Sequence, residues 1–252
     1  MIRLARTNRS HIAQWWWTVD KLTLFGLFSL MLIGGVLALA ASPAVAMRIH
    51  LPPFHFVYRQ LFFFMPAVAT IIGVSLLDVR QVRRLAALVF VTAFTLMILT
   101  LLIGPEVKGA HRWLQIGPLA IQPSEFVKPS FVVLAAWMFA EAQRTPGFPG
   151  TLIALALYGM VVSVLALQPD FGQLMLVTLV FGAVFFMAGL SWRWIGSLTV
   201  IALVGAVAAY TLSPHVTSRV DRFLNPESGD TYQIDRALDA FHTGGVFGRG
   251  PG

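Results

Sequence analysis

The sequence has 252 residues, of which 57% are hydrophobic and only 12% are charged, and its mean hydropathy is +0.76. Water-soluble proteins carry about 25% charged residues, so this composition excludes an ordinary soluble domain. Cysteine is absent, which excludes disulfides, thiolate metal sites and cysteine nucleophiles. The net charge of +7 favours anionic lipid or an anionic substrate over nucleic acid, because no segment between the apolar runs is long enough for a nucleic-acid module.

Apolar runs long enough to cross a hydrocarbon layer, about 20 residues each, recur along the chain. A basic and aromatic segment, residues 1–21, precedes the first run and is expected to be cytoplasmic. The fourth run is the least apolar, since Glu125 and Lys128 stand in its first turns. The sequence therefore predicts an all-α polytopic membrane protein with seven transmembrane helices, over residues 22–47, 60–77, 85–104, 122–140, 150–167, 172–190 and 194–212.

Charge in the short connecting segments predicts the orientation. If the N-terminus is cytoplasmic, the inner segments carry the N-terminal arginines with Arg80, Arg83, Arg84 and Arg144, and the outer segments carry fewer basic residues. The first run resembles a signal peptide, but it is longer than an h-region of about 7 to 15 residues. It is therefore predicted to stay as an uncleaved helix.

The remaining stretch, residues 213–252, is rich in charge and glycine and cannot lie in hydrocarbon. It is predicted to begin a large outer (periplasmic) loop, with a turn at 228–230 and a short amphipathic helix over 232–241. Seven spans and an unfinished outer loop are typical of a fragment. A complete protein with its C-terminus outside is the alternative.

The connecting segment 104–128 mixes cations with aromatic and apolar residues. Lys108, His111 and Arg112 beside Trp113 form a basic patch with an aromatic edge, which suits a lipid headgroup that carries phosphate. An ordinary interfacial anchor is the plainer alternative.

Glu125 and Lys128 stand three residues apart, so on a helix they share a face and neutralise each other while partly buried. Such a pair within a span is a hypothesis of function, and a structural ion pair that fixes helix packing is an equal alternative. Ser124 can instead cap this helix, with Gln122 and Pro123 setting its start.

The run Gln168-Pro-Asp-Phe-Gly172 interrupts a long apolar stretch, and the predicted topology places it on the same outer side as Arg112. Its carboxylate, Asp170, is a candidate site residue, and a tight turn with a solvated aspartate is the alternative. The histidines show no metal-ligand spacing. No metal site is predicted and no cofactor is evident, while a need for a divalent cation stays open.

These stretches together resemble the shape, elongation, division and sporulation family. Its motifs are matched by Lys108-Gly-Ala-His-Arg-Trp-Leu with Gly117-Pro, Gln122-Pro-Ser-Glu-Phe-Val-Lys128, Gln168-Pro-Asp-Phe-Gly172 and Gly244-Gly-Val-Phe-Gly-Arg-Gly250. The match covers essentially everything after the first twenty residues and is closer to the division members than to the elongation members. It implies ten spans with both termini inside, so that this sequence ends within the large loop after span seven.

The resemblance implies a peptidoglycan glycosyltransferase that polymerises lipid II, an undecaprenyl-diphosphate-linked disaccharide peptide, during septal wall synthesis and cell division. Such a step needs a base at the attacking hydroxyl and positive charge at the departing diphosphate. The catalytic residue is unknown, because the family's essential aspartate lies beyond Gly252, and this stretch alone is expected to be inactive. The substrate-binding residues expected here are Lys108, Arg112, Trp113, Glu125, Lys128, Gln168 and Asp170, with Arg112 and Lys128 facing the diphosphate.

The resemblance also implies partners and a location: a class B penicillin-binding protein, other division proteins, and the bacterial inner membrane at the septum. Two other functions stay open. The first is a flippase or transporter for the same lipid, because Glu125, Lys128 and helices interrupted near Pro66 and Pro123 also suit a translocation path. The second is a noncatalytic scaffold that recruits division proteins.

Overall fold

The computed structural model describes residues 11–107, 110–117, 119–189 and 232–245, with short stretches at 196–197, 200, 203–205, 207–208, 210–211, 216–217, 221 and 248. The chain forms two compact units. Unit 1 consists of Met1–Asp78 with Asp230–Gly252, and unit 2 consists of Val79–Gly229.

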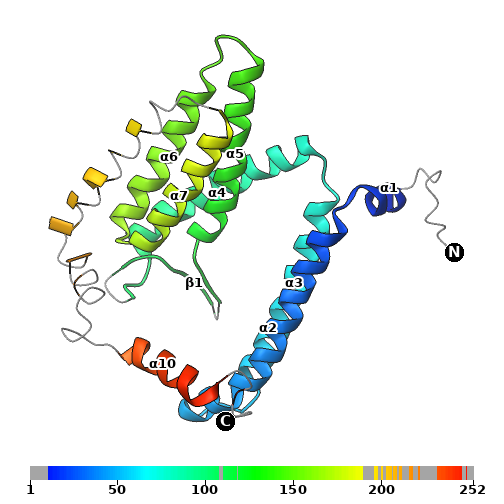
Figure 1. Ribbon diagram of the computed structural model, residues 1–252, viewed down its shortest axis with the longest axis vertical. Coiled ribbons are helices and arrows are strands. Elements are labelled where there is room, and N and C mark those ends of the chain that lie inside the picture. The colour runs from blue at the N-terminus through cyan, green and yellow to red at the C-terminus, as the bar shows by residue number, and fades with distance from the viewer. Residues whose placement is uncertain are drawn as a thin grey trace. The chain divides into compact units, whose positions relative to one another are not determined.

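Unit 1 contains a long helical hairpin of α2 (Lys21–Arg48) and α3 (His55–Ser75), preceded by the short helix α1 (His11–Thr18) (Figure 1). The indole of Trp15 in α1 donates a 2.8 Å hydrogen bond to the hydroxyl of Ser75 at the end of α3. The sequence predicts an interfacial aromatic segment here but no helix. This hydrogen bond joins α1 to the hairpin. It connects residues that are far apart in the sequence, so no local sequence pattern predicts it.

The start of α2 is fixed by Asp20, whose carboxylate accepts hydrogen bonds from the amides of Leu22 at 3.0 Å and Thr23 at 3.3 Å. The hydroxyl of Thr23 donates to the same carboxylate at 2.5 Å. These bonds, the Thr23 hydroxyl first, hold the pKa of Asp20 below its ordinary value of 3.8. They satisfy amides that the first turn of a helix leaves without partners.

Unit 2 is a helical bundle in which α5 is central and contacts α4, α6 and α7. Val127, Phe131, Ala135 and Phe139 repeat at helical spacing along α5 and are buried. Phe181 of α7 packs against two of these rings. Helix α5 carries the most charged residues of these helices, and its central position means that protein rather than lipid covers it. The elements of unit 2 are α4 (Val79–Ile103), β1 (Leu114–Ile116), β2 (Leu119–Ile121), α5 (Ser124–Arg144), α6 (Gly150–Leu167) and α7 (Phe171–Met187).

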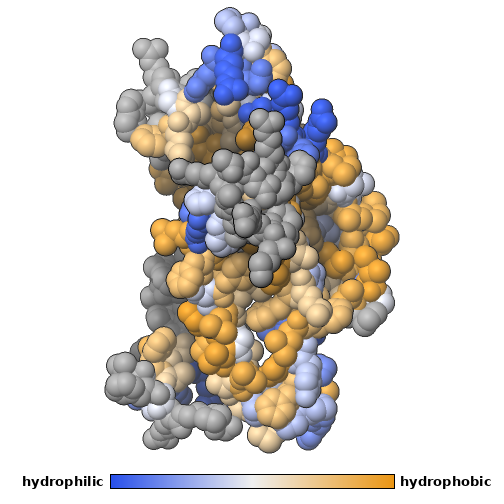
Figure 2. All heavy atoms as spheres, turned by 90° about the vertical axis from the view of Figure 1, so that its right-hand side faces the viewer, coloured by the Kyte–Doolittle hydropathy of each residue, from blue (hydrophilic) through white to orange (hydrophobic). Residues whose placement is uncertain are grey.

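The surface of the protein is apolar to a degree that suits lipid. Figure 2 shows hydrophobic residues over much of the visible face, and large side chains such as Phe25, Leu102 and Met187 are mostly exposed. Among the described residues, α2, α3, α4 and α6 are long and apolar enough to cross a membrane, and α7 is apolar but only 17 residues long. The chain is therefore a helical multi-pass membrane protein, as predicted.

Each of the first six predicted spans overlaps a helix, but the ends of the helices differ from the predicted ends. Helix α4 starts six residues before the predicted 85–104, because Arg80 and its neighbours continue the helix outside the apolar run. Helix α7 ends at Met187 rather than at 190, and Gly189 then takes a φ of +71°, a conformation that stops a helix and suits glycine. The span 194–212 lies largely outside the described residues, as does the turn at 228–230.

The interrupted helices expected near Pro66 and Pro123 are absent. Helix α3 runs through Pro66 without a break, and Pro123 stands at the start of α5, where it and Gln122 are predicted to set the beginning of the helix. A proline in a membrane helix is tolerated when surrounding groups compensate for its missing amide.

The all-α prediction also misses an antiparallel pair, β1 with β2, in register Leu114↔Ile121 and Ile116↔Leu119. Three-residue strands are too short to give an alternating pattern in the sequence. Further along, helix α10 (Tyr232–Gly244) forms where a helix over 232–241 is predicted.

Candidate functional site

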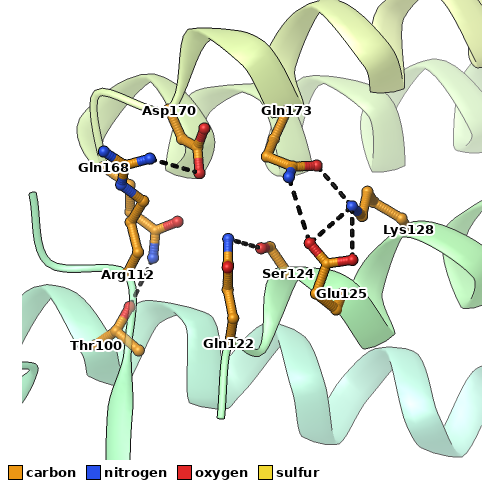
Figure 3. Close-up of polar contacts among 9 residues, drawn as sticks. All are labelled: Thr100, Arg112, Gln122, Ser124, Glu125, Lys128, Gln168, Asp170 and Gln173. Carbon is orange, nitrogen blue, oxygen red and sulfur yellow. Dashed lines mark hydrogen bonds and ion pairs between the residues drawn. The ribbon is translucent and has the colours of Figure 1, made fainter. Parts of the chain in front are cut away.

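A group of polar side chains gathers at one end of unit 2, where α4 ends, α5 begins and α6 turns into α7 (Figure 3). Gln168, Asp170 and Gln173 come from the turn between α6 and α7 and the start of α7. Arg112 comes from the segment between α4 and α5, and Glu125 and Lys128 come from the first turns of α5. The whole group, here called the site cluster, consists of Thr100, Arg112, Gln122, Ser124, Glu125, Lys128, Gln168, Asp170 and Gln173.

Asp170 and Arg112 form an ion pair with 3.3 Å between the Asp170 Oδ2 and the Arg112 Nη1. The Asp170 side chain is only 8% exposed and that of Arg112 20% exposed. Asp170 occupies the N-cap position of α7, yet its side chain makes no capping bond. The carboxylate is therefore directed at the guanidinium and is not the solvated aspartate of a plain turn.

Gln168 holds the same turn against α4. Its side-chain amide donates to the Thr100 hydroxyl at 2.6 Å and to the Met97 carbonyl at 3.1 Å, and both Gln168 and Thr100 are buried. Thr100 in turn donates to the Met97 carbonyl at 2.7 Å. Both amide hydrogens of Gln168 are thus used inside the protein, so Gln168 positions Asp170 and its neighbours.

Lys128, Glu125 and Gln173 form a closed triangle. The Lys128 ammonium lies 2.8 Å from each oxygen of Glu125 and donates to Gln173 Oε1 at 2.6 Å. The Gln173 amide donates to Glu125 Oε1 at 3.3 Å. The predicted pairing on one face of a helix is present, and Gln173 links it to α7. The Lys128 side chain is 19% exposed and that of Glu125 is 50% exposed, so Glu125 is the more solvent-accessible member of this pair.

Local backbone structure positions Arg112. The preceding residue, His111, donates from Nδ1 to the carbonyl of Gly104 at 2.7 Å, and Leu114 in β1 is buried two residues later. A Cβ at Gly104 would lie 2.4 Å from the Thr100 carbonyl, so only glycine permits this close return of the chain. Trp113 is half-buried beside Arg112, while Lys108 lies outside the described residues.

The alternative role given to Ser124 is wrong. Helix α5 begins at Ser124 itself, with Pro123 as its N-cap and no side-chain capping bond. The first amides of the helix donate to the backbone carbonyls of Gln122 and Pro123 instead. The Ser124 hydroxyl accepts from the Gln122 side chain at 3.1 Å, so both side chains belong to the site cluster.

The structure brings the predicted residues together through the first turn of α7. Asp170 and Gln173 are three residues apart at the start of this helix and therefore neighbours on its surface, and each holds one of the two cations, Arg112 and Lys128. The prediction that Gln168-Pro-Asp-Phe-Gly172 lies on the same side as Arg112 is thus correct.

Sequence reasoning missed Gln173 and Thr100. Gln173 follows directly on the recognised motif and is a polar residue at the start of an otherwise apolar helix, which is a usable signal. Thr100 gives none, because threonines that bond their own helix backbone are ordinary in this chain, as at Thr92 and Thr95.

Charge within the site is balanced, because Arg112 and Lys128 face Asp170 and Glu125. A guanidinium offers five N–H donors and an ammonium three, so an incoming anion can bind to donors that the ion pairs leave free or displace a carboxylate. Among the residues that the structure describes, no three His, Cys, Asp or Glu side chains are grouped to hold a metal ion.

Comparison with known proteins decides the family. The family model for the cell cycle proteins FtsW, RodA and SpoVE matches residues 21–252. The chain belongs to this family. It is 45% identical over 249 residues, 98% of its length, to a Caulobacter vibrioides protein named "Probable peptidoglycan glycosyltransferase FtsW". It is 30% identical, over 94% of its length, to a Coxiella burnetii protein of the same name. The resemblance drawn from the motifs, including its leaning toward the division members, is confirmed.

Solved structures of relatives have the same fold. A structure described as "Structural coordination of polymerization and crosslinking by a peptidoglycan synthase complex" matches with a TM-score of 0.68 at 28% identity, over 91% of this chain and 67% of that one. Thermus thermophilus rod shape determining protein RodA matches with a TM-score of 0.59 at 26% identity, over 75% of this chain and 60% of that one. The chain spans 64% of the Caulobacter relative and 65% of the Coxiella relative, less than two thirds of either.

Proposed function

We propose that the protein is a peptidoglycan glycosyltransferase that polymerises lipid II into glycan strands during cell division. Membership of the family and the names of the curated relatives support this reaction. The observation that carries it is the pairing of Arg112 with Asp170 and of Lys128 with Glu125 at one end of the bundle, on residues that match the family's motifs.

The two cations suit the charge that develops as the reaction proceeds. A sugar hydroxyl forms a bond to the anomeric carbon of a second lipid-linked disaccharide, the bond from that carbon to the diphosphate breaks, and the hydroxyl proton passes to a base. Negative charge grows on the departing diphosphate, and fixed cations stabilise it most when little water competes. Arg112 and Lys128, 20% and 19% exposed, provide such cations. The base is assigned to none of the residues described here.

The ion pairs hold both cations in place before substrate arrives. The Asp170–Arg112 pair fixes the guanidinium through one of its nitrogens and leaves most of its donors for phosphate oxygens. Lys128 gives donors to Glu125 and Gln173, so its remaining capacity is at most one N–H. Arg112 therefore makes the larger share of contacts with the diphosphate, and Lys128 adds charge at a fixed position.

The proposal also covers the partners of the protein and its location in the cell. A class B penicillin-binding protein would crosslink the strands that this protein makes, and other division proteins would bring both to the septum of the inner membrane. The support is the family, together with the matching peptidoglycan synthase complex, which is described as coordinating polymerization and crosslinking.

The experiment supplies purified full-length protein, reconstituted in lipid vesicles, with lipid II and measures both chain growth and lipid crossing. Glycan chains that shorten or vanish in the Arg112→Gln variant are expected. Lipid crossing without chain growth would instead favour a transporter. Unchanged cell growth with both Arg112→Ala and Lys128→Ala inserted in the membrane would favour a scaffold.

A further inference from the structure

A cluster of cations lies at the other end of unit 2 from the site cluster. Helix α4 carries Arg80, Arg83 and Arg84 in its first two turns and reaches the site at Thr100. Helix α5 packs against α4 and ends at Arg144, and its Trp137 lies beside Arg83 near the start of α4. The 25 residues of α4 extend about 37 Å at a rise of about 1.5 Å each, which exceeds a hydrocarbon layer of about 30 Å. The four arginines, here called the arginine patch, therefore face the membrane surface opposite to the site.

The arginine patch is not neutralised by the residues around it. Arg80, Arg84 and Arg144 are exposed, and among the described residues no ion pair joins them to a carboxylate. Even with Asp78 and Glu141 counted, the four arginines leave a net charge of +2. Arginines one turn apart on a helix repel each other, so an anion bound among them would stabilise the arrangement.

The contacts of Arg83 indicate the depth of the arginine patch in the membrane. Its guanidinium sits 5.3 Å from the ring centre of Trp137 in α5, and both side chains are half-buried. Tryptophan favours the headgroup region of a bilayer. The contact therefore holds Arg83 at the headgroup level, with Arg80 and Arg84 exposed beside it on the first two turns of α4.

Below the cations, the same face of α4 is apolar and exposed. Leu88 and Val91 follow Arg84 at helical spacings of four and three residues, so they share its face, and they are 63% and 62% exposed. This order, cation first and hydrocarbon next, matches a phospholipid with its phosphate at the surface and its chains inside. An acidic protein segment would match the charge alone.

We propose that the arginine patch binds the phosphate of an anionic phospholipid, with an acyl chain along Leu88 and Val91. The site is separate from the one that holds the diphosphate, and it does not depend on the proposed polymerase activity. Arg80 and Arg84 contact the headgroup, Arg83 stays against Trp137, and the lipid anchors the end of the α4–α5 pair at the membrane surface.

Native mass spectrometry of the full chain, released from detergent with added lipid, tests this proposal. Phosphatidylglycerol and phosphatidylcholine with identical chains are compared in the R80Q/R84Q variant and in R48Q/R59Q, which removes the same charge from exposed positions in unit 1. At about fivefold for each arginine near an anionic headgroup, R80Q/R84Q is expected to bind phosphatidylglycerol about twenty-five-fold more weakly. Phosphatidylcholine binding should stay unchanged in both variants.

Three results would overturn the proposal. They are equal losses in both double variants, no preference of the unmodified chain for phosphatidylglycerol, and binding of a polyglutamate peptide at the patch without any lipid preference. If R80Q/R84Q does not fold, the single variants R80Q and R84Q provide the test, because each removes one charge and should weaken phosphatidylglycerol binding about fivefold. In the unmodified chain, raising the salt concentration should weaken phosphatidylglycerol binding selectively.

Discussion

Replacing Gln173 by leucine tests whether α7 positions the lysine of the site. The substitution keeps the size of the side chain and removes the 2.6 Å bond from Lys128 and the 3.3 Å bond to Glu125. A hydrogen bond to a charged group contributes about 1.5 to 3 kcal/mol. Because Lys128 keeps its 2.8 Å contacts with Glu125, the lower end applies, and about 1.5 kcal/mol corresponds to roughly a tenfold loss in rate.

The assay is lipid II polymerisation by the full-length protein, with kcat and KM measured separately. The loss should fall on kcat, because a displaced ammonium stabilises the departing diphosphate less while the rest of the lipid still binds. The matched control is Gln143→Leu, because the Gln143 side chain on α5 donates to the Ala188 carbonyl at the other end of α7. Equal losses of kcat in both variants, or none for Gln173→Leu, would refute the positioning role.

Further predictions concern the ion pair, the buried amide and the helix cap. Asp170→Asn and Arg112→Gln should each lower the thermal midpoint by leaving a largely buried charge unpaired, at about 1 to 3 kcal/mol, and the double variant should regain stability in a double-mutant cycle but no activity. Gln168→Leu should cost about 2 kcal/mol through its two lost buried bonds, seen as a lower unfolding temperature in detergent. The pKa of Asp20 is lowered in the folded chain, so its capping contribution is present above pH 3.8 and disappears as the pH falls through the lowered value. The protection of the Thr23 amide against hydrogen exchange, measured relative to its intrinsic rate at each pH, should therefore fall at acid pH, and in Asp20→Ala it should be low throughout the pH range.

The sequence predicts the helices well because each apolar run must satisfy its own backbone in lipid. The ends of the helices are less predictable. Arg80 continues α4 beyond the apolar run, and Gly189 ends α7 through a backbone conformation that composition does not reveal.

In the candidate site, too, the sequence predicts local contacts better than contacts between elements. The pair of Glu125 with Lys128 follows from local helical spacing and is predicted. The bonds of Gln173 depend on how α7 packs against α5. The meeting of Arg112 with Asp170 depends on how the turn between α6 and α7 lies against α4 and the segment that follows it. No residue spacing within one helix encodes either contact. The motif places Asp170 on the correct side but does not identify its partner.

The central claim is that Arg112 and Lys128 bind the diphosphate of a lipid-linked substrate. The most direct measurement is the affinity of the full-length protein in vesicles for a polyprenyl diphosphate, compared with the same polyprenyl monophosphate. The unmodified protein and R48Q/R59Q should prefer the diphosphate, and R112Q/K128Q should lose that preference. An undiminished preference for the diphosphate in R112Q/K128Q would contradict the claim.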